Sequence, residues 1–263
     1  MGSQVLLDDP WTAHRQRATG LCEAQPHAAE MLRLYLALSD VWTEVVAEAT
    51  ATPPQPSLAE YAAERSMPRV VQATMVAGPA PVREAVMARF HEIEPVQLIS
   101  GWLRGDTLPA ADRFLARAST APLLEAFPEL ARATGSAAKD ARHCPNCGGP
   151  PQLSFIGLSE EALVSAPRRL LCSRCAGTWT FPRMVCAGCG NEETARMPIY
   201  SDHERFAHLR IDACEVCRGY LVTVDLPKDP KAVPAIDELV ALPLDLYARE
   251  QGFEKITPNL MGF

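Results

Sequence analysis

Apolar positions recur at helical spacing through the first half of the chain. After Pro26 the apolar residues return every three or four positions, which is the pattern of a helix that buries one face. They are Met31, Leu32, Leu34, Tyr35, Leu38, Val41, Trp42, Val45 and Val46. After the proline-rich stretch 52–56, Ser57 and Glu60 have the spacing of a capping box, in which two residues satisfy free amides at a helix start. The sequence thus predicts helices on both sides of that stretch.

Prolines mark the starts of the remaining helices. A proline in the first turn of a helix costs no hydrogen bond, because the amides of that turn have no partner within the helix. We expect helices to begin at Pro81, Pro95, Pro109, Pro122 and Pro128. Together these segments predict an all-helical array with short connections.

The period of the pattern changes after the small, polar stretch 135–140. Short segments of alternating apolar and polar residues follow, and alternation is typical of strands with one buried face. They are QLSFIG (152–157), RRLLC (168–172), TWTFPRMV (178–185), ARMPIY (195–200), HLRIDAC (208–214) and YLVTVDL (220–226). A last periodic segment predicts a helix at about 234–251, kinked or split by Pro243. We expect the apolar tail after it to dock on the body of the protein.

Composition and charge narrow the class of protein. The chain of 263 residues is 48% hydrophobic and 22% charged, which are values of ordinary globular proteins. Its net charge of −7 argues against a nucleic-acid partner, because such proteins present basic surfaces to phosphates. Residues 1–17 lack the apolar core of an export signal, and no stretch of about 18 apolar residues predicts a membrane span. We therefore expect a cytoplasmic protein without membrane insertion.

Eight cysteines form four Cys-x-x-Cys turns in the second half of the chain. The turns are Cys144/Cys147, Cys172/Cys175, Cys186/Cys189 and Cys214/Cys217. The last two turns repeat the first two at an offset of 42 residues, and 24 residues separate the two turns of each unit. Paired cysteines stay reduced in the cytoplasm, so we interpret these as metal ligands rather than disulfides.

Four turns can pair into two four-cysteine sites in three ways. Sequential pairing joins 144/147 to 172/175 and 186/189 to 214/217. A cross-brace joins 144/147 to 186/189, and a nested pairing joins 172/175 to 186/189. Because a duplicated unit should carry a complete site, the repeat favours sequential pairing.

A tetrahedron of four thiolates suits both zinc and iron. Zinc would be structural, whereas iron would be a one-electron redox centre. Either metal would supply folding free energy, because a small ribbon has little hydrophobic core. The cysteine spacing predicts two metal ions and leaves both metals open.

The predicted fold is α+β: an all-α N-terminal helical domain, two tandem rubredoxin-like or zinc-ribbon metal modules, and a C-terminal helix. We place the helical domain at 1–140, the first four-cysteine ribbon at 141–184, the second at 185–228, and the C-terminal helix and tail at 229–263.

Other side chains near the cysteine turns have competing interpretations. For Trp179 and Phe181, packing within the fold is favoured over contact with a partner. Arg168 and Arg210 each precede a turn by four residues, and hydrogen bonding near the thiolates and solvent exposure explain them equally. His143 adjoins Cys144 but is not expected to bind metal, because the cysteines already complete the site. His203 and His208 are expected at the surface.

Motifs of catalysis are missing from the sequence. It contains no phosphate-binding loop, no GxSxG elbow and no HExxH pair, and no set of residues suggests general acid–base or nucleophilic chemistry. We therefore predict no catalytic residues and a protein that is not an enzyme.

The cysteine motifs and the tail together resemble the FdhE family of formate dehydrogenase accessory proteins. The residues that carry the resemblance are CPNCGG (144–149), RRLLCSRCAGTWTFPRMVCAGCG (168–190), DACEVCRGY (212–220) and DLYAREQGFEKITPNLMGF (245–263). The resemblance implies a cytoplasmic protein required for active respiratory formate dehydrogenase, a molybdenum enzyme, whose catalytic subunit it would contact before export. It also implies rubredoxin-type iron, with the eight cysteines as ligands.

Two other functions fit the cysteine pattern. One is a rubredoxin-type electron-transfer protein, and the other is a zinc-ribbon adaptor for nucleic acid or a polymerase, against which the net charge argues. The sequence predicts no particular oligomeric state.

Overall fold

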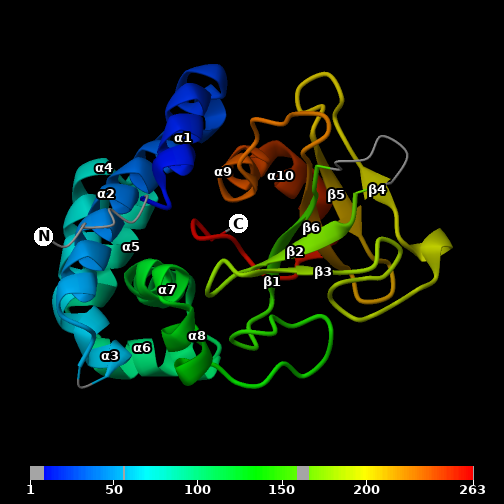
Figure 1. Ribbon diagram of the computed structural model, residues 1–263. Helices are drawn as coiled ribbons and strands as arrows, with labels where there is room; N and C mark the ends of the chain where they lie inside the picture. Colours follow the sequence, from blue (N-terminus) through cyan, green and yellow to red (C-terminus); the bar gives the residue numbers. More distant parts are fainter. Residues whose placement is uncertain (1–8, 56, 159–165, 263) are drawn as a thin grey trace, which may run out of the picture.

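The helical and strand-rich parts of the chain lie side by side in the computed structural model, which describes residues 9–55, 57–158 and 166–262 (Figure 1). Residues 1–8, on which part of the expectation about an export signal rests, lie outside the described residues. No helix within the described ranges is long and apolar enough to cross a membrane.

The first half of the chain is helical, as predicted. Its elements are α1 (Thr12–Ala24), η1 (Pro26–Ala28), α2 (Ala29–Ala51), α3 (Leu58–Tyr61), η2 (Ala62–Ser66), α4 (Met67–Ala77), α5 (Ala80–Phe90), α6 (Pro95–Arg104), α7 (Ala110–Ala126) and α8 (Pro128–Thr134). At the start of α3 the hydroxyl of Ser57 accepts a hydrogen bond from the amide of Glu60 and donates one to its carboxylate. The expected cap is therefore present.

Pro122 does not open a helix, contrary to the prediction. It lies inside α7, where it has no amide hydrogen to donate to the carbonyl of Ala118 one turn earlier. The indole Nε1 of Trp42 donates to that carbonyl instead, over 2.9 Å. A side chain of α2 thus replaces the missing backbone donor, and the helix continues.

The second half forms one mixed sheet in the order β3-β2-β1-β6-β5-β4, with β7 added beside β6. The strands are β1 (Pro151–Ile156), β2 (Arg168–Cys172), β3 (Thr178–Thr180), β4 (Ile199–Tyr200), β5 (Leu209–Ala213), β6 (Gly219–Asp225) and β7 (Glu254–Lys255). Each four-cysteine unit contributes three antiparallel strands. The units are joined by the parallel pairing of β1 with β6, in which Ser154 faces Thr223.

Two predicted strands are shorter than expected. Over 178–185 only β3 is a strand, because Pro182 has no amide with which to continue the pairing. Over 195–200 only β4 is a strand, since the 3-10 turn η3 (Thr194–Arg196) occupies the start of the segment. The other four strands lie within one or two residues of their predicted bounds.

The C-terminal part is a split helix followed by a docked tail, as expected. α9 (Pro234–Val240) ends before Pro243, which lies in the first turn of α10 (Leu242–Glu250). The tail then adds β7 to the sheet and buries Phe253 and Asn259. Its red end in Figure 1 returns between the two halves of the molecule.

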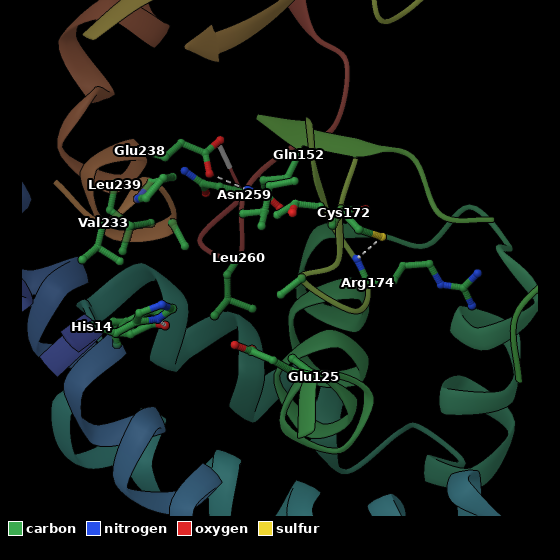
Figure 2. Close-up of a pocket in the computed structure, with 18 of the residues that line it drawn as sticks. His14, Glu125, Gln152, Cys172, Arg174, Val233, Glu238, Leu239, Asn259 and Leu260 are labelled. Atoms are coloured by element: carbon green, nitrogen blue, oxygen red, sulfur yellow. Dashed lines mark hydrogen bonds between the residues drawn. The ribbon is translucent and has the colours of Figure 1, made fainter. Parts of the chain in front are cut away.

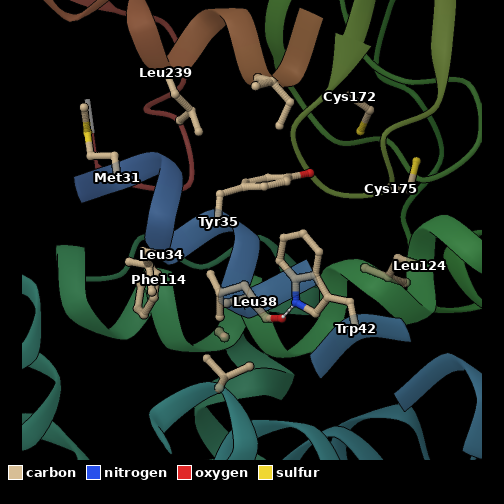
Figure 3. Close-up of a cluster of buried hydrophobic side chains, with 14 of the residues drawn as sticks. Met31, Leu34, Tyr35, Leu38, Trp42, Phe114, Leu124, Cys172, Cys175 and Leu239 are labelled. Atoms are coloured by element: carbon tan, nitrogen blue, oxygen red, sulfur yellow. Dashed lines mark hydrogen bonds between the residues drawn. The ribbon is translucent and has the colours of Figure 1, made fainter. Parts of the chain in front are cut away.

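One hydrophobic core extends across both halves. It contains residues of α2, α4 and α7 together with β5, β6, α9 and the cysteines of the first unit. Figure 3 shows Tyr35 and Trp42 of α2 between Leu239 of α9 on one side and Cys172 and Cys175 on the other. The first four-cysteine unit is therefore part of the core of the helical half.

Candidate metal centres

The first turn of each unit has the same backbone geometry. In the first unit the amide of Cys144 donates to the carbonyl of Gly149, and the amide of Gly148 donates to the carbonyl of Cys144, both over 2.9 Å. The second unit repeats both bonds 42 residues later. Gly148 has a φ of 68° and Gly190 a φ of 81°, in the left-handed region where glycine is strained least. Glycine adopts this conformation with the least strain in the first turns, whereas Ala176 and Arg218 adopt a positive φ at the same position of the second turns.

The second turn of each unit is also copied. The amide of Cys172 donates to the carbonyl of Gly177, and that of Cys214 to Gly219, over 2.9 Å in both cases. The hairpins that follow have matching registers, with Leu170 opposite Trp179 in one and Asp212 opposite Leu221 in the other. Each hairpin therefore presents its second turn in the same way.

The structure confirms the sequential pairing of the turns. The first cluster contains Cys144, Cys147, Cys172 and Cys175, and the second cluster contains Cys186, Cys189, Cys214 and Cys217. In the first cluster the sulfurs of Cys144 and Cys175 are 3.7 Å apart, and those of Cys147 and Cys172 are 3.5 Å apart. The corresponding distances in the second cluster are 3.7 Å and 3.8 Å.

These distances fit a four-coordinate metal. A tetrahedron with metal–sulfur bonds of about 2.3 Å, the length for zinc, has sulfur–sulfur edges of about 3.8 Å. Backbone amides also point at the sulfurs: Arg174 donates to Cys172 and Gly188 donates to Cys186. Each cluster can therefore hold one metal ion in a tetrahedron of thiolates.

Four sulfurs so close together share protons unless a cation lies among them. Hydrogen bonds from Cys147, Cys172 and Cys175 hold the pKa of Cys144 far below its usual value. Hydrogen bonds with the other three cysteines raise the pKa of Cys172 well above its usual value. The pKa of Cys147 is lowered as well, so the close sulfurs favour the thiolate form at some positions and the thiol form at others. A metal ion favours the deprotonated form of every ligand, so the donor set fits a metal cation.

Comparisons with known proteins find FdhE proteins among the similar sequences and structures. The family model "FdhE, C-terminal domain" matches residues 184–261. An FdhE homolog of Aquifex aeolicus is 37% identical over 121 residues, which are 46% of this chain and 42% of that protein. One of Pseudomonas aeruginosa is 31% identical over 209 residues, 73% of this chain and 65% of that protein. The chain is similar to FdhE proteins, and its residues 184–261 match the model of their C-terminal domain.

The fold agrees with that of a solved FdhE structure. The crystal structure of the FdhE protein from Pseudomonas aeruginosa matches with a TM-score of 0.68 at 24% sequence identity, over 96% of this chain and 95% of that one. The alignments to curated FdhE homologs are shorter: this chain spans 42% of the Aquifex protein and 37% of one from Haemophilus influenzae.

The two clusters differ in exposure. All four cysteines of the first cluster are buried. In the second cluster Cys189 is half-buried and Cys217 is exposed. The difference arises because the cysteines of the first cluster belong to the hydrophobic core shared with the helical half, whereas those of the second cluster do not. Solvent therefore reaches cysteine residues of the second cluster and not those of the first.

Arg174, inside the second turn of the first cluster, ties that cluster to the helices. Its guanidinium donates to the carbonyls of Trp102, at 3.1 Å, and of Leu103, both in the last turn of α6. A cation at this position also interacts favourably with the negative end of the helix dipole. No pattern in the sequence predicts this contact, because Arg174 and α6 are about 70 residues apart.

The contacts of Arg168 and Arg210 are neither hydrogen bonds to the thiolates nor simple exposure to solvent, the two interpretations that the sequence left open. Arg168 is only 4% exposed and donates to the carbonyl of Val185 over 3.0 Å, so it is neither solvated nor bonded to sulfur. Arg210 forms an ion pair with Asp212 over 2.8 Å, and Arg168 approaches the other oxygen of that carboxylate at 3.6 Å. Two arginines at equivalent positions of the repeat thus meet at one aspartate.

Trp179 and Phe181 pack within the fold, which is the interpretation that the sequence favoured over contact with a partner. The indole Nε1 of Trp179 donates to the carbonyl of Ala141 over 2.9 Å, and Phe181 is 3% exposed in a small cluster with Leu170 and Leu221. These aromatic side chains therefore hold the ribbon together.

The histidines lie outside both clusters. His143 bonds to Asp140 at 3.0 Å and His203 is exposed, in agreement with the expectation. His208 was expected at the surface, which is wrong: its side chain is 15% exposed and bonds to Asp237 at 2.7 Å. Arg17 of α1 also binds Asp237, so this polar group joins the helical half to the sheet. His208, Asp237 and Arg17 are far apart in the sequence, so no local sequence pattern predicts this group.

A cavity of about 300 Å³ lies between the two halves beside Cys172 (Figure 2). Its charged lining residues are Arg117 and Glu125 of α7, Arg174 of the second turn and Glu238 of α9. Burial lowers the pKa of Arg117 to about 10 and raises that of Glu125 to about 7. Leu260 of the tail closes one side of the cavity, so the chain itself lines the space next to the first cluster.

Proposed function

We propose that this protein is an accessory factor for the maturation of formate dehydrogenase and is not itself an enzyme. The observation that carries the proposal is the pair of four-cysteine clusters, built from a repeated unit and placed in an FdhE-type fold. Neither cluster has an open coordination position, because four thiolates complete a tetrahedron. Such centres shape a protein or carry an electron, and they leave no position for a substrate.

The eight cysteines would be the ligands of two metal ions. Iron is favoured by the family resemblance, and zinc remains compatible with the sulfur geometry. The two metal modules would cover 141–184 and 185–228, between a helical domain at 1–140 and a C-terminal part at 229–263.

The partner would be the catalytic subunit of formate dehydrogenase, bound in the cytoplasm before its export. Contact through the helical domain is favoured over contact through the strand at Trp179, because the indole of Trp179 is already bonded within the fold. The net charge of −7 favours a protein partner over nucleic acid, because proteins that bind nucleic acid present basic surfaces to its phosphates.

The test is complementation of a strain from which this gene has been deleted. The wild-type chain should restore formate dehydrogenase activity without changing transcription of the enzyme's genes, and Cys147→Ser should not. Cys22→Ser is the matched control, because Cys22 lies in α1 outside both clusters. Full activity in the deletion strain itself would end the proposal.

An electron-transfer role is the second candidate, and the exposure of Cys217 favours it. Electrons pass efficiently only to a centre near the surface, and the second cluster is such a centre. Anaerobic purification followed by elemental analysis and an absorption spectrum decides between the roles. Ferric tetrathiolate absorbs visible light and can be reduced reversibly, whereas a colourless protein with two zinc ions would exclude electron transfer.

A further inference from the structure

Two arginines of the first unit reach across to the first turn of the second cluster. Arg142, which lies two residues before Cys144, donates to the carbonyl of Gly188 over 2.6 Å. Gly188 lies between Cys186 and Cys189, and its own amide donates to the sulfur of Cys186. The stretch before the first cluster therefore holds the middle of a ligand turn in the second.

Arg168 holds the same second-unit turn from another side. It extends from β2, four residues before Cys172, and donates to the carbonyl of Val185, which directly precedes Cys186. Its guanidinium is also 3.6 Å from the carboxylate of Asp212, two residues before Cys214. A single buried side chain of the first unit thus contacts the approaches to both turns of the second cluster.

The described residues show no equivalent contact in the opposite direction. Arg210, which occupies the position of Arg168 in the second unit, bonds to Asp212 within its own unit. The first cluster is held instead by the helical half: the amide of Ser136 donates to the carbonyl of Cys147, and Arg174 donates to the end of α6. The helices thus support the first cluster, and the first unit supports the second.

We propose that Arg142 and Arg168 are positioning residues for the second cluster, and that metal binding at the first cluster is required for tight binding at the second. The inference rests on the proposed role of the cysteines as metal ligands. Without metal the first unit loses the tetrahedron that fixes 144–147 against 172–175. Arg142 and Arg168, which flank these turns, then no longer hold Val185 and Gly188 in place.

The physical basis is preorganisation. A ligand turn whose carbonyls are already held loses less conformational entropy when the metal binds. Outer partners of metal ligands typically change metal affinity by about 10–100-fold when they are removed. We expect an effect of that size on the second cluster and no effect on the first.

Cobalt(II) is a suitable probe, because its absorption reports coordination by four thiolates. The metal-free full-length chain would be titrated with Co²⁺ anaerobically, and the loaded chain would then be challenged with EDTA. Wild-type protein should bind two ions and release them in a fast and a slow phase. A Cys214→Ser/Cys217→Ser variant should lack only the fast phase, which assigns that phase to the second cluster.

Two double variants test whether the second cluster depends on the first and whether the first depends on the second. Cys144→Ser/Cys147→Ser should weaken Co²⁺ binding at the remaining second cluster by at least about tenfold. Cys214→Ser/Cys217→Ser should leave the affinity of the first cluster unchanged. Arg168→Gln and Arg142→Gln should each accelerate the fast phase alone. Arg169→Gln is the matched control, because Arg169 lies on the same strand and, within the described part of the chain, its side chain bonds to the hydroxyl of Thr178.

Three results would overturn the inference. The first is a second cluster that binds Co²⁺ with wild-type affinity in Cys144→Ser/Cys147→Ser, and the second is equal acceleration of both phases in the arginine variants. The third result is a wild-type chain that binds no Co²⁺, which would also reject the assignment of the cysteines as ligands.

If Arg168→Gln fails to fold, the Arg142→Gln variant decides. The side chain of Arg142 is 31% exposed, so its replacement leaves no cavity in the core.

Discussion

The ammonium of Lys255 lies 2.8 Å from a carboxylate oxygen of Glu238, and both side chains are 1% exposed. The same ammonium is 3.2 Å from Asp245, which also accepts a hydrogen bond from the hydroxyl of Tyr220. One lysine of the tail thus neutralises two buried carboxylates from α9 and α10. Replacing it leaves both carboxylates in a region of low dielectric constant, where an unpaired charge is costly.

We therefore expect Lys255→Met to lower the free energy of unfolding by about 3–5 kcal/mol. Urea denaturation of the metal-loaded protein measures the change, and hydrogen exchange should show that the tail after residue 252 has become less protected. Glu254→Gln is the control, since Glu254 is exposed on the same strand. Equal stabilities of Lys255→Met and the control would contradict the importance of the buried charge group.

The contact between Trp42 and the carbonyl of Ala118 predicts a coupling with Pro122. Trp42→Phe leaves that buried carbonyl without a donor as well as reducing the packed volume. Pro122→Ala restores a backbone amide that can donate to the same carbonyl. The cost of Trp42→Phe should therefore be about 1 kcal/mol smaller in the Pro122→Ala background, which a double-mutant cycle of unfolding free energies measures. Additive costs would show that the indole does not substitute for the missing amide.

Gly148 and Gly190 allow a matched comparison within one molecule. Both have positive φ, so alanine at either position should cost roughly 1–2 kcal/mol of backbone strain. A Cβ on Gly148 would lie 2.4 Å from the carbonyl oxygen of Ser136, whereas one on Gly190 would come no nearer than 3.9 Å to Arg142. Thermal unfolding should show a clearly larger loss for Gly148→Ala. Equal losses would mean that residues 135–136 move aside freely.

Glu125 predicts a dependence of stability on pH. Burial raises its pKa from 4.5 to about 7, so the folded state holds a proton that the unfolded state releases between these values. The wild-type carboxyl therefore lowers stability progressively as pH rises from about 4.5 to 7, and its cost is constant above that. Glu125→Gln should match wild type near pH 4 and be more stable by about 3 kcal/mol at pH 8.

The control for this prediction is Glu129→Gln, because Glu129 is exposed on α8. Unfolding free energies of the three proteins at pH 4, 6 and 8 give the comparison. A constant difference between Glu125→Gln and wild type over this range would show that Glu125 does not change its protonation on folding.

Local repetition explains what the sequence predicted well. The offset of 42 residues predicted the pairing of the turn 144/147 with the turn 172/175, because a copied unit copies its hairpin, including its register. Prolines at helix starts predicted α6 and α8 to the residue, since the first turn of a helix tolerates the missing amide. These features depend on residues that are near each other along the chain.

Contacts between distant residues explain what the sequence could not predict. Pro122 has the sequence pattern of a helix start, but the helix continues through it because the indole of Trp42 donates a hydrogen bond to the carbonyl of Ala118. Arg168 belongs to the first unit by position, yet its carbonyl partner is in the second. Periodicity describes which face of an element is buried and says nothing of what covers it, so these relationships became visible only in three dimensions.

The parallel pairing of β1 with β6 has a consequence for how the chain reaches this structure. The hairpins within each unit are local and close quickly, whereas Ser154 and Thr223 are 69 residues apart. We expect the two finished units to join late, and until then β1 and β6 each present an unpaired edge. In concentrated solution, the β1 edge of one molecule can then pair with β6 of another. Exchange of whole ribbons between molecules is therefore the misfolding route to which this architecture is most exposed.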